Sequence, residues 1–147
     1  MPVNFSDTNV LVHLVSGDVS KADRAEATIA GGGSISVQVL NELANVARRK
    51  MQMSWDETHA FLDMLRGLLT VHPVTVETHE TGLRLAERYG LSIYDSMIAA
   101  SALHAGCDTL WSEDMQHGMK LDEGLRIANP FRGGWRLGET RFAINTD

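Results

Sequence analysis

Short runs of β-branched and apolar residues alternate with longer segments of helical periodicity, and this alternation limits the fold more than any other feature of the sequence. Each strand-like run leads into a helical segment and then into another run, an order typical of parallel sheets with helices on both faces. We therefore predict an α/β fold with a mostly parallel central sheet of about five strands. Proline is disfavoured inside central strands, so Pro73 predicts either that its strand lies at an edge or that Pro73 marks a strand entry point. The expected strands are residues 2–5, 34–38, 70–76, 109–111 and 125–131.

Capping residues mark the ends of several helices. Ser20 precedes Asp23 by three residues, and Ser54 precedes Glu57 by the same spacing, which is the capping-box pattern of a helix start. Gly90 follows a helical segment and predicts its end, because glycine readily adopts the left-handed conformation that closes many helices.

Length and composition indicate one ordinary globular domain. The chain has 147 residues, of which 44% are hydrophobic and 22% are charged, enough to build a core without disulfides or a structural metal. The single cysteine, Cys107, excludes a disulfide framework and favours a reducing, cytoplasmic setting. We expect neither a signal peptide nor a membrane span, because no run of roughly 18 uncharged apolar residues occurs. A net charge of −6 argues against a passive nucleic-acid coat protein.

Asp95 stands at the head of an otherwise apolar helix that begins after Ser92. A carboxylate placed against a core needs a partner, and neighbouring residues offer no Lys or Arg to supply one. The residues of this helix that we expect to be buried are Ile98, Ala99, Ala102 and Leu103.

Four acids map to the carboxyl ends of the predicted strands, where ligand sites form in open parallel α/β sheets. Asp7 follows the first strand, Glu42 lies in the first turns of the helix after the second, and Asp114 follows the run "TLW". Asp95 opens its helix after a short connection. Although they are far apart in sequence, these side chains are expected to converge.

Each acid also has a purely structural explanation. Asp7 could cap a helix, Glu42 could be solvated, Asp95 could complete a capping box with Ser92, and Asp114 could be a turn residue. Taken together, these explanations require four coincidences at one edge of the sheet, so we favour a joint site. Clustered carboxylates raise one another's pKa unless a cation is present. Because no His or Cys has ligand spacing, the oxygen-only donor set favours Mg²⁺ or Mn²⁺ and a phosphate-ester substrate.

The segments "SDTNVLVHLV", "VLNELANVARRK", "YGLSIYDSMIAASALHAGCDTLWSEDMQHG" and "IANPF" together resemble the PIN domain found in VapC-type toxins of bacterial toxin–antitoxin pairs. The resemblance runs from about residue 3 to residue 131, in the family's order and spacing. It carries the family's acids onto Asp7, Glu42, Asp95 and Asp114, and its supporting polar residues onto Thr8, Asn9 and Ser112.

The fourth acid has two candidates, because Glu113 and Asp114 are adjacent. The family places this acid three residues beyond the last apolar position of the strand, which favours Asp114. Glu113 remains the alternative.

The resemblance implies a three-layer α/β/α fold, with residues 1–131 as the PIN domain and residues 132–147 as a tail that is disordered or forms an interface. It implies an endoribonuclease that hydrolyses RNA through a water activated by Mg²⁺ or Mn²⁺, held by Asp7, Asp95, Asp114 and Glu42. It also implies inhibition by a VapB-like antitoxin, and a homodimer. Two alternatives stay open: a non-catalytic RNA- or protein-binding module, and a Mg²⁺-dependent phosphatase. The phosphatase is disfavoured because Asn9 stands where that class carries a second aspartate.

Overall fold

Within the part of the chain that the structure describes, the central sheet is mostly parallel and has six strands. The computed structural model describes residues 4–122 and 124–132, and the strand order is β3-β2-β1-β4-β6-β5. Neighbouring strands from β3 to β6 pair in parallel, and only the edge pair β5–β6 is antiparallel. The strands are β1 (Asn4–Ser6), β2 (Ser34–Ser36), β3 (Thr70–His72), β4 (Thr109–Trp111), β5 (Lys120–Leu121) and β6 (Leu125–Ala128).

All five expected strands are present. β4 has the predicted bounds, whereas β2, β3 and β6 are shorter than the sequence suggests. β3 ends just before Pro73 and lies at the edge of the sheet, which is the first of the two alternatives predicted from Pro73. β5 was missed because it has only two residues, too few for an alternating pattern to appear. It pairs in antiparallel fashion with β6 and forms the second edge of the sheet.

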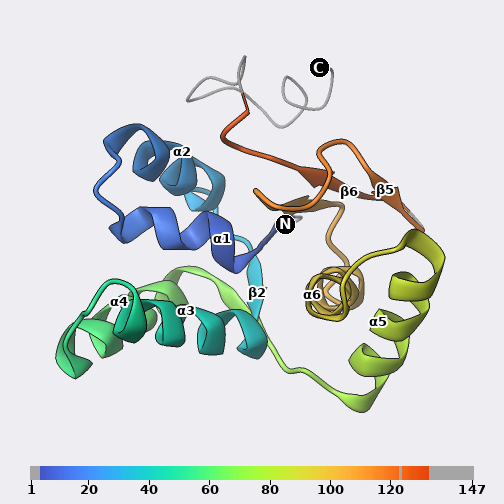
Figure 1. Ribbon diagram of the computed structural model, residues 1–147, viewed down its shortest axis with the longest axis horizontal. Coiled ribbons are helices and arrows are strands. Elements are labelled where there is room, and N and C mark those ends of the chain that lie inside the picture. The colour runs from blue at the N-terminus through green and yellow to red at the C-terminus, as the bar shows by residue number, and fades with distance from the viewer. Residues whose placement is uncertain (1–3, 123, 133–147) are drawn as a thin grey trace.

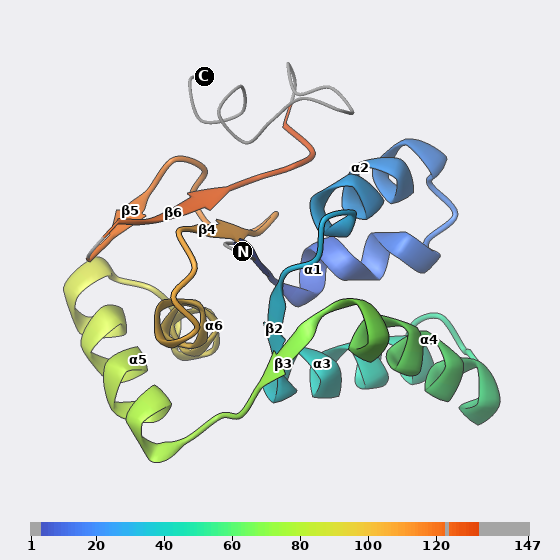
Figure 2. The same ribbon diagram turned by 180° about the vertical axis from the view of Figure 1, so that it is seen from behind.

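Helices cover both faces of the sheet. Figures 1 and 2 show α5 and α6 on one side of β2, and α1, α3 and α4 on the other, which confirms the three-layer arrangement. In the described part of the chain, no helix is both long and apolar enough to cross a membrane. The helices are α1 (Thr8–Leu11), the 3-10 helix η1 (Val12–Val15), α2 (Val19–Ile29), α3 (Val37–Arg49), α4 (Trp55–Leu68), α5 (Val76–Tyr89) and α6 (Ile93–His104).

The predicted caps are confirmed in two cases and wrong in one. Ser54 and Glu57 form the expected capping box at the start of α4. Gly90 ends α5 in the left-handed conformation, with φ 72°. The expected start of α2 at Ser20 is wrong, because Asp18 caps this helix by accepting a hydrogen bond from Lys21 N (3.1 Å). Ser20 therefore lies inside the first turn.

Helix α6 is buried around its whole circumference from Ser96 to Ala102. It lies between α5 and the sheet, and its small side chains allow close packing. Gly82 of α5 marks the tightest approach, since an added Cβ would lie 2.5 Å from Met97 Sδ. Ile98 and Ala99 are buried as expected, whereas Leu103 is only partly buried because it lies near the exposed end of the helix.

We expect Ile98→Ala to lower the free energy of unfolding by about 2–5 kcal/mol, because it leaves a cavity at a side chain that is 2% exposed. Urea denaturation followed by circular dichroism measures the change. Leu103→Ala is the control on the same helix and should cost clearly less. Equal costs would contradict the central position of Ile98 in the core.

Candidate functional site

The four predicted acids converge on one cleft of about 450 Å³. Asp7 reaches it from the end of β1 and Asp114 from the turn after β4. Glu42 comes from α3 and Asp95 from the first turn of α6. Parallel pairing of β1 with β4 brings the first two together, although 107 positions separate them in the sequence. Lys50, at the end of α3, also lines this cleft.

Asp7 is the most buried of these acids, with 5% of its surface exposed. Its Oδ1 accepts a hydrogen bond from Thr8 N (2.7 Å), so the structural explanation as the cap of α1 holds as well. Its Oδ2 accepts from Ser112 Oγ (2.9 Å) and from Asn9 Nδ2 (3.3 Å). The supporting residues implied by the resemblance thus all contact Asp7, and Ser112 ties the end of β4 to the end of β1.

Burial raises the pKa of Asp7 to about 7, even though the hydrogen bonds from Ser112 and Thr8 lower it. The negative charges of Asp95 and Glu42 raise it further. The pKa of Asp95 is also raised, first by burial and then by the charges of Asp114 and Glu42. These carboxylates are therefore close enough to repel one another, which is the electrostatic signature of a site that attracts cations.

Glu42 is held at the cleft rather than freely solvated. Thr8 Oγ1 donates to its Oε1 (2.5 Å), and Gln38 Nε2 donates to its Oε2 (3.1 Å). Because Thr8 directly follows Asp7, the bond to Glu42 joins the start of α1 to α3.

Asp95 forms only half of the capping box considered from the sequence. Ser92 Oγ accepts a hydrogen bond from Asp95 N (3.1 Å) and caps α6. In a full capping box, such as that of Ser54 and Glu57, the acidic side chain also accepts a hydrogen bond from the backbone N of the cap residue. Among the described residues, the Asp95 side chain forms no such bond with Ser92 N. Its carboxylate lines the cleft instead.

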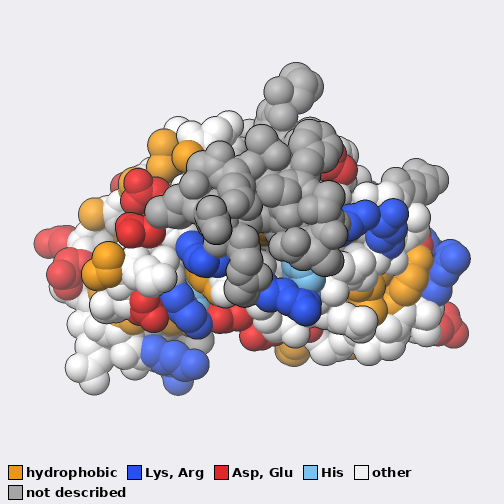
Figure 3. Space-filling model, turned by 90° about the horizontal axis from the view of Figure 1, so that it is seen from above, with side chains coloured by type: hydrophobic (Ala, Val, Ile, Leu, Met, Phe, Trp, Pro, Cys, Tyr) orange, Lys and Arg blue, Asp and Glu red, His pale blue; other side chains and the backbone are white. Residues whose placement is uncertain are grey.

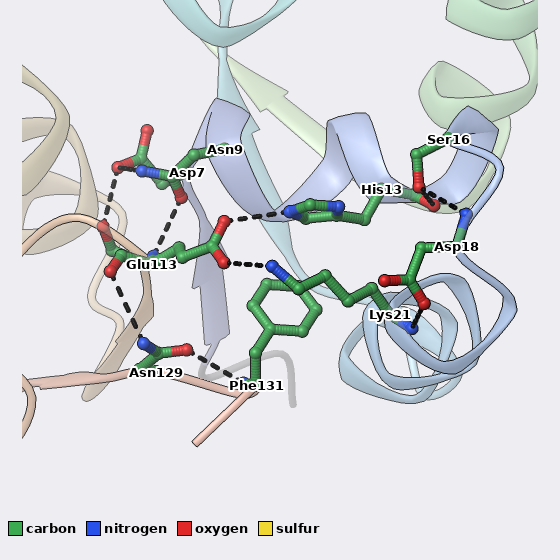
Figure 4. Close-up of polar contacts among 10 residues, drawn as sticks. Asp7, Asn9, His13, Ser16, Asp18, Lys21, Glu113, Asn129 and Phe131 are labelled. Carbon is green, nitrogen blue, oxygen red and sulfur yellow. Dashed lines mark hydrogen bonds and ion pairs between the residues drawn. The ribbon is translucent and has the colours of Figure 1, made fainter. Parts of the chain in front are cut away.

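Glu113 and Asp114 face different surroundings. Figure 4 shows the Glu113 carboxylate pointing toward His13 and Lys21, with Oε1 2.9 Å from His13 Nε2 and Oε2 2.8 Å from Lys21 Nζ. Burial raises the pKa of Glu113, but these two partners outweigh burial and hold it below its usual value. Asp114 is exposed and lines the cleft. The geometry therefore favours Asp114 as the fourth acid.

His13 and Lys21 were not singled out by the sequence analysis. Lys21 is separated from Glu113 by 92 positions and His13 by 100, so no local motif joins them. The only local signal was a histidine or a lysine on each of two early helical segments.

The oxygen atoms that line the cleft suit a hard cation such as Mg²⁺. Among residues 4–122 and 124–132, no three carboxylate, imidazole or thiol groups stand together as a ready-made ligand set. Mg²⁺ commonly binds through one or two carboxylates and keeps several waters, so it does not need such a cage. The donor set is oxygen only, and the mutual repulsion of the acids would be relieved by a cation.

The surface outside the cleft is not uniformly basic. Figure 3 shows Lys and Arg side chains interspersed with Asp and Glu side chains over one face of the molecule. On this face basic and acidic groups are mixed, and Lys50 places one basic group at the cleft itself.

A family model for the PIN domain matches residues 5–118, which include all four acids of the cleft. The chain belongs to the PIN-domain family. Comparison with curated protein sequences gives no match.

Solved structures with the fold of this PIN domain include toxins of toxin–antitoxin pairs. The chain is similar to Mycobacterium tuberculosis VapC20, described as a sarcin–ricin loop cleaving toxin (22% identity, TM-score 0.62, covering 76% of this chain and 89% of that one). It is similar to a toxin–antitoxin complex from Klebsiella pneumoniae (20%, 0.66, 87% and 98%). It is also similar to Rickettsia felis VapBC2 bound to a promoter DNA fragment (20%, 0.62, 86% and 97%). At this level of identity, the likeness concerns the fold.

The raised pKa of Asp7 predicts a pH-dependent cost to stability in the metal-free PIN domain. The pKa of an aspartate in the unfolded chain is 3.8, whereas that of folded Asp7 is about 7. Between these values folded Asp7 holds a proton that the unfolded chain has lost, so stability falls as pH rises through this window. Asp7→Asn removes this loss. Its free energy of unfolding should rise relative to wild type by on the order of 4 kcal/mol between pH 4 and 8.

Urea denaturation in EDTA at a series of pH values measures this difference. Asp122→Asn is the control with the opposite sign, because a hydrogen bond from Arg84 lowers the pKa of Asp122. For Asp122, the stabilisation is present above pH 3.8 and is lost as pH falls through the lower folded pKa. Parallel pH curves for wild type and Asp7→Asn would contradict the shifted pKa of Asp7.

Proposed function

We propose that the protein is a VapC-type toxin, an endoribonuclease that depends on Mg²⁺ or Mn²⁺ and hydrolyses RNA phosphodiester bonds. The observation that carries this proposal is the convergence of Asp7, Glu42, Asp95 and Asp114 on one cleft, with pKa values of Asp7 and Asp95 raised by burial and mutual repulsion. Membership of the PIN-domain family supports the nuclease class. The RNA-cleaving activity of the similar mycobacterial toxin supports RNA as the substrate.

In this proposal the four carboxylates would hold the cation, directly or through the waters that it keeps. When bound, the cation supplies an activated water for attack on phosphorus and stabilises the developing charge. Asp7 is oriented by Ser112 and Asn9, while Thr8 orients Glu42, so the acids are positioned before any ligand arrives. Ordered placement of this kind lowers the cost of reaching the reactive geometry.

Lys50 supports a phosphate-bearing substrate because it lines the same cleft as the acids. It follows Glu42 by eight positions along α3, which is about 12 Å along a helix axis. A strand of RNA that crosses the acids could thus place a neighbouring phosphate beside Lys50, a contact that adds affinity without sequence selectivity.

A VapB-like antitoxin is the proposed protein partner. An apolar groove of about 590 Å³ adjoins the acid cleft and shares Glu42 and Asn45 with it. Exposed Ile93 and Tyr94 line this groove. An antitoxin segment lying there could extend a basic side chain to the acids, and so block the substrate path. The toxin–antitoxin complexes among the similar structures support this partner, and we also propose that the protein forms a homodimer.

The phosphatase alternative is weakened by the contacts of Asn9. Asn9 Nδ2 donates to Asp7 Oδ2 (3.3 Å), and Asn9 Oδ1 accepts from Glu113 N (2.9 Å). Both ends of this amide are used to hold neighbouring loops, so Asn9 does not act as the second acid of a phosphatase pair. The non-catalytic binding module is separated from the nuclease by the experiment that follows.

Asp95→Asn and Asp114→Asn should each abolish Mn²⁺-dependent cleavage of RNA, because each removes a charge from the cation site. Calorimetric titration with Mn²⁺ should show binding by wild type and strongly weakened binding by both variants. Neither variant should melt at a much lower temperature, since neither side chain is fully buried.

Asp63→Asn is the matched control, an exposed aspartate on α4 outside the cleft, and it should bind and cleave as wild type does. Wild type that binds RNA without cleaving it would favour the binding module. Release of phosphate from small esters would favour the phosphatase.

A further inference from the structure

Glu113 is the centre of a polar network on the far side of the turn that bears Ser112 and Asp114. Its two carboxylate oxygens are taken up by His13 Nε2 (2.9 Å) and Lys21 Nζ (2.8 Å). These partners come from η1 and α2, whereas Glu113 follows β4 (Figure 4). The network therefore joins η1 and α2 to the carboxyl end of β4.

The backbone of Glu113 is held as firmly as its side chain. Glu113 N donates to Asn9 Oδ1 (2.9 Å), and Glu113 O accepts from Asn129 Nδ2 (3.4 Å). Asn9 in turn contacts the Asp7 carboxylate. One side-chain amide thus spans the loop that carries Asp7 and the turn that carries Asp114.

The partners that hold Glu113 are themselves supported by Phe131, which follows β6. Lys21 Nζ lies 5.3 Å from the centre of the Phe131 ring, and the His13 ring packs edge-on against it at 4.7 Å. Asn129 Oδ1 accepts from Phe131 N (2.9 Å) and fixes this segment next to the network. The Lys21 ammonium is therefore held between an aromatic face and the Glu113 carboxylate.

General stabilisation does not account for the place of this network. The side chains of Lys21 and Glu113 are 38% and 26% exposed, and ion pairs with that much solvent contribute little to global stability. What distinguishes the pair is its position, one residue from Asp114 and one hydrogen bond from the residue that orients Asp7.

We propose that Glu113, held by Lys21 and His13, is a positioning residue that fixes the Ser112–Asp114 turn relative to Asp7. The inference rests on the proposed function, because it assigns Glu113 to the geometry of the same cation site without contact to substrate. Lys21 is the second positioning residue, acting through Glu113. Groups that orient metal-binding side chains commonly change metal affinity or activity by about 10–100-fold when they are replaced.

Hydrogen exchange tests the positioning directly and needs neither metal nor RNA. The amides to follow are Glu113 N, bound to Asn9 Oδ1, and Met115 N, bound to Ser112 Oγ (3.3 Å). Lys21→Met should speed exchange at both amides by about 10-fold, because local opening of the turn becomes easier, and Lys21→Arg should restore slow exchange. Glu113→Gln, which keeps the size of the side chain, is the second variant should Lys21→Met fold poorly.

Arg84→Met is the matched control. It breaks the ion pair between Arg84 and Asp122, which lies away from the cleft. It should leave exchange at Glu113 and Met115 unchanged. Unchanged exchange in both Lys21→Met and Glu113→Gln would overturn the proposal, as would an equal increase in Arg84→Met.

Calorimetry with Mn²⁺ alone supplies the functional readout. Lys21→Met should weaken Mn²⁺ binding by about 10-fold and lower kcat for RNA with little change in KM, since the substrate contacts are intact. A lower melting temperature with unchanged Mn²⁺ affinity would reduce the network to a structural role and overturn the proposal. If wild type neither binds Mn²⁺ nor cleaves RNA, the proposed function fails, whereas hydrogen exchange still decides whether Glu113 positions the turn.

Discussion

The burial of the Asp7 carboxylate at the meeting point of β1 and β4 is the constraint on which the rest of the site depends. A charge in this position is costly unless hydrogen bonds satisfy it, and Ser112, Thr8 and Asn9 supply them. Even so, the pKa of Asp7 stays near 7, because burial outweighs these donors. The fold therefore holds an acid that is half protonated near neutral pH, and whose ionisation is favoured by any cation that enters the cleft.

Close helix packing makes the second part of the site possible. Asp95 can face Asp7 only if α6 runs close to the sheet, and the alanines and serines of that helix allow this approach. Gly82 lets α5 pack against Met97 on the opposite side. The apolar character of α6, which made Asp95 conspicuous in the sequence, is thus the consequence of a helix buried between another helix and the sheet.

The convergence of the four acids on one cleft could be predicted from the sequence, because each acid lies at a local feature: the end of a strand or the first turns of a helix. Their role in a cation site stays a prediction. The sequence also predicts the parallel sheet, since alternation is a local pattern. Sequence-based prediction of a helix start fails where two nearby residues could both be the N-cap. At the start of α2 the cap is Asp18 rather than Ser20. The hairpin strand β5 is too short to leave a pattern.

The contacts of Glu113 with His13 and Lys21 could not be predicted from the sequence for a different reason. The two partners are held at distances of 2.8 and 2.9 Å by the tertiary fold, and nothing in the identity of Lys21 or His13 points to a residue 92 or 100 positions away. A resemblance to known motifs transfers the acids but not the residues that orient them. The sequence predicts a tail of residues 132–147, of which only Arg132 belongs to the described residues.

The two neighbouring acids of the turn after β4, Glu113 and Asp114, lie in different electrostatic surroundings. The Glu113 carboxylate contacts His13 and Lys21, and its pKa is lowered, so it is ionised at neutral pH. Asp114 faces the cleft with Asp7 and Asp95, whose pKa values are raised. Ion pairs among the described residues thus involve Glu113 and Asp122 rather than the cleft acids. Lys21 therefore offsets the charge of Glu113 and not that of the cleft acids, whose mutual repulsion a cation in the cleft would relieve.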